Sequence, residues 1–439
     1  MCENVERKNM QAVIMAGGKG TRLTSVTKEQ IPKPMVRIGK KPILEYQINT
    51  LKENKITDIW IITGPLHEII EDYFGDGSKW GVRIHYFIEQ QAMGTGGALF
   101  FLKQELKNDF FLLFGDIFFD IDLKRMMEFH QSRRASITLF AHPNSHPADS
   151  DLVILDDKQR VNHILRKNEP RIGYYKNMVN GGLYCFHACV LDSILKAGYL
   201  DLEKELIFPR IQIYQDVFGY ISPEYVKDIG TPKRLRTAEE EWESGLVKGR
   251  NLGRKQKCIF VDRDGTLNRY VGLLADAEVL ELEEQVPDAV KLAHKKGYLV
   301  IVITNQPVIA RNLCSLKELE QIHNRLEVLL GEQGAYVDAI KFCPHHPDKG
   351  YPEERTEYKI PCHCRKPEIG LIEEAAAEFH IDLSNSYMIG DTTTDIRTGK
   401  NAGLKTVLVQ TGVAGRDGKY SDKPDQIARN LLEAVKMME

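Results

Sequence analysis

The chain has 439 residues, with 59 lysines and arginines against 62 aspartates and glutamates, which gives a formal net charge of -3. Hydrophobic residues make up 42% and charged residues 28%, which excludes a mostly disordered, collagen-like or coiled-coil protein. Without a basic excess or a long apolar run, we expect no nucleic-acid partner and no membrane segment. Eight cysteines are too few for a disulfide scaffold, and the N-terminus lacks an apolar signal core. We therefore expect a cytoplasmic protein of two or three domains, and leave homo-oligomerisation open.

From residue 11 onward, short apolar runs typical of buried strands alternate with helical patterns. The expected strands cover residues 11–16, 58–64, 83–89 and 110–116. The expected helices cover residues 42–54, 67–75 and 94–106. Because strands and helices alternate strictly, we predict a mainly parallel sheet with both faces covered.

This alternation breaks down in a charged stretch with scattered glycines, residues 239–257, after which a new pattern begins with a strand. The later strands are expected at residues 258–266, 298–305, 337–343, 386–391 and 405–412. Helices are expected at residues 287–296, 315–333 and 367–380. We predict two tandem α/β, Rossmann-like domains with mainly parallel sheets. Their bounds are 1–245 and 257–439, with a linker at 246–256.

The first strand runs directly into a glycine-rich turn, MAGGKGTRL at residues 15–23. Glycines let backbone amides approach phosphate oxygens, and Lys19 and Arg22 add positive charge. Lys33 stands between two prolines, which is a rigid mount for a cation. A second glycine-rich turn at residues 93–98 is suited to a flat base and its ribose. One such turn alone is weak evidence, but the combination indicates a nucleotide site.

Two carboxylates accompany these turns. Asp116 ends an apolar strand, and Asp228 follows in the sequence VKDIGTP. A lone aspartate after a strand is most often a helix cap, but the two together could hold Mg²⁺.

These motifs, in this order, resemble those of the sugar-1-phosphate nucleotidyltransferases over residues 11–245. The resemblance implies that a sugar 1-phosphate attacks the α-phosphorus of a nucleoside triphosphate and releases pyrophosphate. It implies catalytic roles for Arg22 and Lys33 and a Mg²⁺ pair of Asp116 and Asp228. The implied nucleotide contacts are Ala16, Gly17, Gly18, Gly20, Thr21, Gly94, Thr95, Gly96 and Asp116. The implied sugar-phosphate contacts are Asn180, Gly181, Lys167 and Lys204.

Two of these sugar-phosphate contacts have alternatives. Lys204 is nearly as well explained as a solvated lysine on a helix. Lys167 is a candidate only, because the usual Glu-Lys-Pro of the family is replaced around it by RKNEP at residues 166–170.

In the second half, an apolar strand ends in Asp262-Arg263-Asp264. Two carboxylates at this spacing point the same way, so one can attack phosphorus while the other exchanges a proton with the leaving oxygen. Polar residues follow the later strands and could complete a phosphate and Mg²⁺ site: Thr304, Asn305, Arg365, Lys366, Asp391 and Asp395.

This set resembles the haloacid-dehalogenase-like (HAD) phosphatases from residue 258 to the C-terminus. The resemblance implies that Asp262 is the nucleophile and Asp264 the general acid and base. It implies phosphate binding by Thr304, Asn305, Arg365 and Lys366, and Mg²⁺ held by Asp262, Asp264 and Asp391. The gaps between the motifs leave no room for a separate cap domain, so we expect an open, capless HAD fold.

Cys343, His345, Cys362 and Cys364 supply three thiolates and one imidazole in close-spaced pairs, which suits a closed structural Zn²⁺ site. This zinc loop narrows the resemblance to the heptose 1,7-bisphosphate 7-phosphatases and the histidinol-phosphate phosphatases. Pro307-Val308 and Thr392 depart from the pattern of the heptose phosphatases, which commonly have Ser-Gly and Lys there.

Joining the two halves makes chemical sense, because loss of the 7-phosphate from a heptose 1,7-bisphosphate gives the heptose 1-phosphate that the first half would activate. GTP is the preferred nucleotide, since the first half resembles the heptose 1-phosphate guanylyltransferases around GTGGAL. The expected partners are therefore small molecules, GTP and heptose phosphates. Three alternatives stay open: a mannose 1-phosphate guanylyltransferase with an unrelated sugar phosphatase, a histidinol-phosphatase-like second half, and a sugar-nucleotide sensor without turnover.

Overall fold

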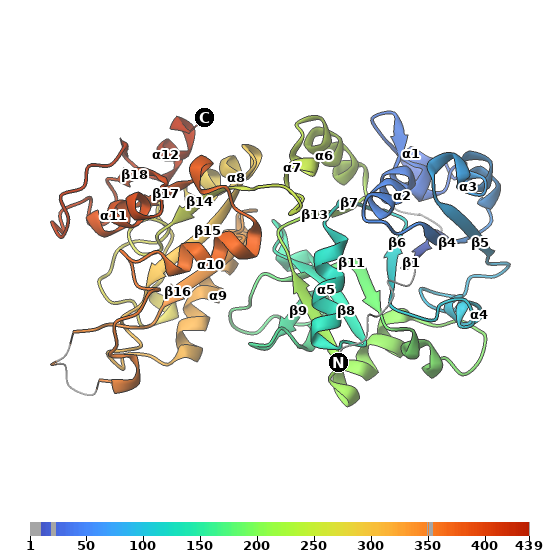
Figure 1. Ribbon diagram of the computed structural model, residues 1–439, viewed down its shortest axis with the longest axis horizontal. Coiled ribbons are helices and arrows are strands. Elements are labelled where there is room, and N and C mark those ends of the chain that lie inside the picture. The colour runs from blue at the N-terminus through green and yellow to red at the C-terminus, as the bar shows by residue number, and fades with distance from the viewer. Residues whose placement is uncertain (1–9, 19–22, 349, 351–353, 439) are drawn as a thin grey trace, which may run out of the picture. The chain divides into compact units, whose positions relative to one another are not determined.

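The computed structural model describes residues 10–18, 23–348, 350 and 354–438 (Figure 1). The chain divides into two compact units, which are described separately. The first comprises the residues up to Ala141 with Val153–Leu165 and Asn180–Asn251, and the second comprises His142–Leu152, Arg166–Val179 and the residues from Leu252 onward. The change of unit at residues 251–252 falls within the stretch that we expected to be a linker. No sequence pattern predicted that the two short segments would group with the second unit.

In the first unit, four parallel strands form the part of the sheet that carries the glycine-rich turns. They are β6 (Phe110–Phe114), β1 (Gln11–Met15), β4 (Asp58–Thr63) and β5 (Arg83–Ile88), in that order. The sheet continues from β6 through antiparallel β11 to the strands β9, β10, β8 and β12. These strands cover Val179–Phe186, Leu152–Leu155, Val161–Leu165, Ile137–His142 and Val217–Ile221. The sheet is therefore mixed, and its parallel part matches the predicted alternation.

Helices and two small strand pairs complete this unit. The helices are α1 (Thr24–Thr27), α2 (Ile43–Glu53), α3 (His67–Phe74), α4 (Leu99–Leu102), α5 (Leu123–Arg133), α6 (Pro232–Glu243) and α7 (Leu246–Gly249). The pairs are β2 (Arg37–Ile38) with β3 (Lys41–Pro42), and β7 (Ile117–Asp120) with β13 (Tyr225–Asp228). The helix expected at residues 94–106 is reduced to α4, because the amides of Gly96 and Gly97 donate to the carbonyls of Leu200 and Met93 in a turn.

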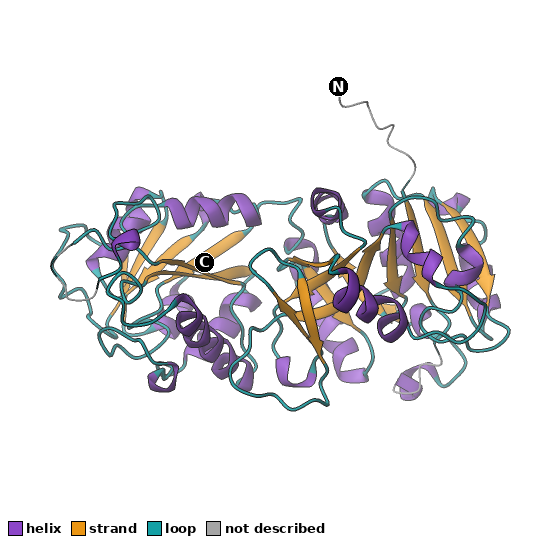
Figure 2. Ribbon diagram, turned by 90° about the horizontal axis from the view of Figure 1, so that it is seen from below, coloured by secondary structure: helices purple, strands orange, loops and turns teal. Residues whose placement is uncertain are grey.

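In the second unit, six strands pair in parallel throughout. Their order is β16 (Ala339–Cys343), β15 (Tyr298–Asn305), β14 (Lys257–Val261), β17 (Tyr387–Gly390), β18 (Lys405–Val409) and β19 (Gln426–Ala428). Helices lie on both faces of the sheet (Figure 2): α8 (Val286–Lys295), α9 (Leu316–Glu332), α10 (Gly370–Phe379), α11 (Thr393–Asn401) and α12 (Leu431–Met437). The strand order is that of a doubly wound Rossmann-like sheet, as predicted.

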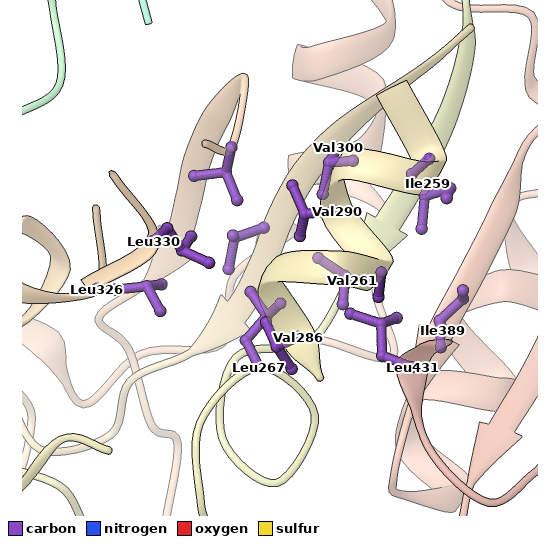
Figure 3. Packing of buried hydrophobic residues seen from close by; sticks show 14 of the residues in the cluster. Ile259, Val261, Leu267, Val286, Val290, Val300, Leu326, Leu330, Ile389 and Leu431 are labelled. Atoms are coloured by element: carbon purple, nitrogen blue, oxygen red, sulfur yellow. The ribbon is translucent and has the colours of Figure 1, made fainter. Parts of the chain in front are cut away.

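Alternate residues of β14 serve opposite faces of this sheet. Val261 packs with Val300 and with Val286 and Val290 of α8 in the larger core (Figure 3). Phe260 points the other way, into the core that contains α10. Because both faces are covered by apolar side chains, the polar ends of the strands remain the place for chemistry.

The strand order reverses at β14, whose neighbours β15 and β17 lie on either side. In open parallel sheets, ligands bind beyond the carboxyl ends of the strands at this point of reversal. The fold therefore directs attention to the residues that follow β14, β15 and β17. In the described part of the chain, no helix combines the length and apolarity needed to cross a bilayer.

Candidate functional sites

The first glycine-rich turn follows β1, and its first residues pack closely against the ends of the neighbouring strands. The Ala16 amide donates to the Ile62 carbonyl at 2.7 Å. A Cβ atom on Gly17 would lie only 2.7 Å from Oε2 of Glu89, so a larger residue there would displace the Glu89 side chain. Gly18 has open space around it. The predicted contacts Gly20, Thr21 and Arg22 lie outside the described residues.

Glu89, which follows β5, is a residue that the sequence analysis missed. Its side chain lies against Gly17, and burial raises the pKa of its carboxyl group, against the effect of a hydrogen bond from the Met93 amide. In the described part of the chain, Oε1 of Glu89 is buried without a hydrogen-bond partner. A buried acceptor of this kind requires a donor from water, from a ligand or from a residue outside the described ranges. An acidic residue at the end of a strand is common and does not by itself indicate a site. The only feature of the sequence that could have indicated Glu89 is its position between the two glycine-rich turns.

Lys33 and Asp116 form the charged centre of the first unit. Nζ of Lys33 lies 3.0 Å from Oδ2 of Asp116, and their side chains are 13% and 26% exposed. Asp228 occupies the β13 position that pairs with Ile117 of β7, and the Ile229 amide donates to the Asp116 carbonyl. The backbones of the two predicted Mg²⁺ residues, Asp116 and Asp228, are thus next to each other. The Asp228 carboxylate accepts a hydrogen bond from Arg234.

The second glycine-rich turn is fixed by the segment around Leu200. Gly94 has a φ of +77°, and a Cβ atom there would lie 2.4 Å from the Leu200 carbonyl oxygen. Gly96 donates its amide to the same oxygen, and the hydroxyl of Thr95 accepts a hydrogen bond from the Leu202 amide at 2.8 Å. Thr95 therefore helps to hold the turn in place.

The predicted sugar-phosphate contacts do not all come together. The Asn180 amide nitrogen donates to the Tyr184 hydroxyl and to Glu203, and the adjoining Gly181 packs closely against Phe140. The Lys204 side chain is 69% exposed and lies 3.8 Å from Asp201, as for a solvated helix lysine. Lys167 is exposed, and it lies in the segment 166–179 that groups with the second unit.

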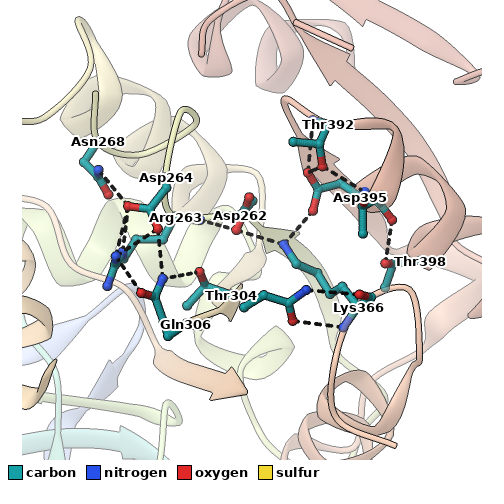
Figure 4. A network of polar contacts seen from close by, with 12 residues as sticks. Asp262, Arg263, Asp264, Asn268, Thr304, Gln306, Lys366, Thr392, Asp395 and Thr398 are labelled. Atoms are coloured by element: carbon teal, nitrogen blue, oxygen red, sulfur yellow. Dashed lines mark hydrogen bonds and ion pairs between the residues drawn. The ribbon is translucent and has the colours of Figure 1, made fainter. Parts of the chain in front are cut away.

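In the second unit, one buried lysine connects two carboxylates. Nζ of Lys366 lies 2.8 Å from Asp262 and 2.5 Å from Asp395 (Figure 4). Asp262 follows β14, and Asp395 lies in the first turn of α11 after β17. The side chain of Asn305 clamps the backbone of Lys366 through two hydrogen bonds of 3.0 Å. Asn305, which we expected to contact phosphate, thus holds the lysine that can do so.

Carboxylates gather tightly around this lysine. Asp262, Asp391 and Asp395 are buried, and each offers an oxygen within 4.8 Å of the others. Burial and the neighbouring carboxylates together raise the pKa of Asp262 to about 7 and that of Asp391 to about 8, although Lys366 lowers both. Burial alone would lower the pKa of Lys366, but Asp262 and Asp395 raise it. Because three carboxylates share one lysine, the cluster has an excess of negative charge, which a divalent cation would neutralise.

The donor set fits Mg²⁺, which prefers carboxylate oxygens. Oδ1 of Asp391 is buried and has no hydrogen-bond partner among the described residues, so it is free to coordinate. Its Oδ2 accepts a hydrogen bond from the Val413 amide at 2.7 Å. The expected Mg²⁺ ligand Asp264 is not part of this cluster, and Asp395 is.

Asp264 is instead held by a polar network on the other side of Asp262. Both its oxygens lie 2.9 Å from Nη2 of Arg263, whose side chain is fully buried. Gln306 donates to Asp264 at 2.8 Å and to the Thr304 hydroxyl at 2.9 Å. Asn268 adds a third donor at 3.1 Å (Figure 4). This network orients the carboxylate toward a group bound beside Asp262.

A cavity of about 530 Å³ opens over these residues. Asp262, Asp264, Thr304 and Lys366 line it together with Arg365. A phosphate ester bound there meets a nucleophile, a proton-exchanging carboxylate and cations, which is the equipment for phosphoryl transfer.

The predicted zinc ligands converge in the same unit. The sulfur atoms of Cys343, Cys362 and Cys364 lie 3.2–3.5 Å apart, and Nδ1 of His345 lies 3.3 Å from Cys364. Three thiols and an imidazole around one point are the donor set of a structural zinc site. Cys364 directly precedes Arg365, whose guanidinium donates to the His345 carbonyl at 2.9 Å. The cluster is thereby tied to the wall of the cavity.

Comparison with known proteins matches the two halves of the chain to two families. The nucleotidyl transferase family matches residues 11–245, which is more than half of the chain. A HAD-hydrolase-like family matches residues 363–434. Both matches contain residues that the sequence analysis had selected.

Named relatives of the chain divide between its two halves in the same way. Over 182 residues, 41% of this chain and 97% of the relative, the chain is 37% identical to D-glycero-beta-D-manno-heptose-1,7-bisphosphate 7-phosphatase of Haemophilus ducreyi. Over 234 residues, 53% of this chain and 98% of the relative, it is 34% identical to D-glycero-alpha-D-manno-heptose 1-phosphate guanylyltransferase of Aneurinibacillus thermoaerophilus. It is 33% identical over 241 residues to mannose-1-phosphate guanylyltransferase of Mycobacterium tuberculosis, covering 54% of this chain and 66% of that protein. The chain is an enzyme that belongs to the nucleotidyl transferase family in its first half and to the HAD-like phosphatases in its second half.

Proposed function

We propose that the chain carries out two consecutive steps of GDP-heptose biosynthesis. The second half removes the 7-phosphate of D-glycero-D-manno-heptose 1,7-bisphosphate. The first half transfers GMP from GTP to the resulting heptose 1-phosphate and releases pyrophosphate. The observation that carries the proposal is that the relatives of the two halves are named for consecutive heptose reactions, and each is matched over nearly its full length. We infer domains at 1–245 and 257–439, in a protein of the cytoplasm, where thiol ligands stay reduced.

For the phosphatase half, the Asp262 carboxylate attacks the phosphorus of the 7-phosphate, and the bond from phosphorus to the sugar oxygen breaks. Asp264, which Arg263 and Gln306 orient, gives its proton to that leaving oxygen. Asp264 then takes a proton from the water that hydrolyses the aspartyl phosphate, which releases phosphate and restores Asp262. Thr304 and Lys366 contact the phosphoryl oxygens. Mg²⁺ held by Asp262, Asp391 and Asp395 would neutralise phosphate charge.

For the transferase half, no covalent intermediate is needed. The glycine-rich turns hold the triphosphate and nucleoside, Lys33 neutralises charge at the α-phosphate, and Asp116 with Asp228 would hold Mg²⁺. Positioning and charge neutralisation supply most of the rate in such reactions.

Glu89 supports GTP as the nucleotide. The Watson–Crick edge of guanine offers two neighbouring donors, N1–H and the N2 amino group, which match the two oxygens of a carboxylate. Adenine offers an acceptor at N1, which a carboxylate repels. The Glu89 carboxylate, whose Oε1 is buried without a hydrogen-bond partner among the described residues, is therefore suited to guanine.

We further propose that Cys343, His345, Cys362 and Cys364 bind a structural Zn²⁺. Four protein ligands leave no open position for water, so the metal would shape the loop rather than take part in chemistry.

The proposal is tested by mass spectrometry of the products formed from the protein, Mg²⁺, each nucleoside triphosphate and the 1,7-bisphosphates of both heptose anomers. We expect GDP-heptose from GTP and the α anomer, because the related guanylyltransferase is named for the α sugar. A second candidate for the first half is mannose 1-phosphate guanylyltransferase, which the mycobacterial relative favours. Faster turnover of mannose 1-phosphate than of heptose 1-phosphate would replace the heptose assignment.

A further inference from the structure

The phosphatase cavity is lined by a lysine, Lys419, that has no part in the reaction steps proposed above. Among the described residues, the positively charged side chains that line it are Arg365, Lys366 and Lys419. Lys366 is buried between Asp262 and Asp395, and under the proposed function it contacts the phosphate that is hydrolysed. Lys419 is exposed and makes no ion pair with any other described residue.

The backbone around Lys419 is held firmly, although its side chain is free. The loop that follows β18 carries it. Asp417 accepts hydrogen bonds from the amide and hydroxyl of Thr393, at 2.8 and 2.7 Å. The Tyr420 amide donates to the same hydroxyl at 3.1 Å, and Asp422 accepts a bond from Arg397 at 2.6 Å. Both sides of Lys419 are thus tied to α11, which keeps its side chain at the cavity.

Thr392, which directly follows Asp391, has no positive charge with which to bind a second anion in the cavity. Thr392 also lines the cavity, but its hydroxyl donates to Asp395 at 2.5 Å and caps α11. Arg365 is partly used as well, since its guanidinium donates to the His345 carbonyl. Lys419 is therefore the lining cation best placed to receive an additional anion.

We propose that Lys419 binds the phosphate of the substrate that is not hydrolysed, and so makes the site selective for a bisphosphorylated sugar. This inference rests on the proposed phosphatase function. A sugar bisphosphate presents one phosphate to Asp262 and must place the other elsewhere along the cavity. An exposed lysine on an anchored loop gives that second phosphate a charge-assisted hydrogen bond.

The test measures kcat and KM of the full-length protein, with Mg²⁺, on heptose 1,7-bisphosphate and on heptose 7-phosphate, which lacks the second phosphate. Lys419→Ala should lower kcat/KM for the bisphosphate about tenfold to a hundredfold, through KM, as expected for loss of one charge-assisted hydrogen bond. Activity on heptose 7-phosphate should change less than twofold. Lys419→Arg should restore most of the loss. Lys423→Ala, an exposed lysine of the same loop that does not line the cavity, is the matched control.

Equal losses on both substrates, or no loss on the bisphosphate, would overturn the role of Lys419. Failure of the proposed function looks different, because the unmodified protein would then release no phosphate from the bisphosphate, or would prefer the monophosphate. Salt provides a second readout, since screening should raise KM for the bisphosphate more in the unmodified protein than in Lys419→Ala. Equal salt dependence in the two proteins would also count against the proposal.

Discussion

Two pairs of lysine and aspartate stand at the centres of the two units, and they differ in their surroundings. Lys33 and Asp116 lie 3.0 Å apart as a partly exposed pair. Lys366 and Asp262 lie 2.8 Å apart, with side chains 3% and 12% exposed, and share their pocket with Asp391 and Asp395. The first arrangement suits a site that positions two substrates. The second suits a nucleophile whose charge must be controlled inside the protein.

Among the proposed substitutions, a change at Asp262 should have the largest effect and should affect only one of the two sites. Asp262→Asn keeps the size of the side chain but removes the attacking charge, so phosphate release should fall by at least about 10⁴-fold. Formation of GDP-heptose from heptose 1-phosphate should be unchanged, because Lys33 and Asp116 are untouched. Phosphate release and nucleotide products are measured on the same preparation. Normal phosphate release, in protein free of contaminating phosphatase, would contradict the assignment of Asp262.

The reciprocal change is made in the first unit. Asp116→Ala removes the partner of Lys33 and a predicted Mg²⁺ ligand, so nucleotidyl transfer should fall about a thousandfold. Phosphate release from the bisphosphate should stay within a few-fold. Pyrophosphate and phosphate release are followed in parallel. If a folded Asp116→Ala protein loses both activities, the two sites are not independent.

Glu89 sharpens the comparison within the transferase site. In Glu89→Gln an amide donor faces the donors of guanine, so kcat/KM for GTP should fall about tenfold to a hundredfold. Competition between GTP and ATP, with products quantified by mass spectrometry, measures the change in preference. Gln90→Ala, an exposed neighbour, is the control. An unchanged preference in Glu89→Gln would remove Glu89 from base recognition.

The smallest expected effect on catalysis concerns the zinc loop. Cys362→Ser should lose zinc and lower the unfolding temperature of the second unit by roughly 6–12 °C, equivalent to about 3 kcal/mol. Phosphate release should fall about tenfold, because Arg365 and Lys366 lose their fixed support. Elemental analysis and thermal unfolding provide the measurements, with Cys189→Ser, an exposed cysteine outside the cluster, as the control. Less than half an equivalent of zinc in the unmodified protein would argue against the site.

The sequence predicted most reliably where one local pattern determines the outcome. The strand at residues 298–305 has the expected bounds, because a continuous apolar run leaves little choice in a buried parallel sheet. The four predicted zinc ligands converge as their spacing indicated. The mainly parallel, Rossmann-like architecture followed from the alternation of strands and helices, and it is confirmed.

The parts that the sequence could not provide depend on packing between distant segments. Glu89 becomes a candidate site residue only because its side chain lies against Gly17, which is 72 positions earlier in the chain. In the sequence, Asp264 and Asp395 were both plausible Mg²⁺ ligands. In the structure, Asp264 pairs with Arg263, whereas Asp395 pairs with Lys366 and lies in the cluster with Asp262 and Asp391. Lys167 was selected from a disturbed motif, and its segment groups with the second unit.

The tripeptide Cys364-Arg365-Lys366 belongs at once to the thiol cluster and to the phosphate cavity. Because a zinc ligand and the phosphate-binding residues are adjacent in the chain, the proposed function predicts that the rate of the phosphatase step in a cell depends on the zinc supply. A cell starved of zinc should accumulate heptose 1,7-bisphosphate, since the dephosphorylating half would falter first. GTP-dependent activation would continue in such cells whenever heptose 1-phosphate was supplied from another source.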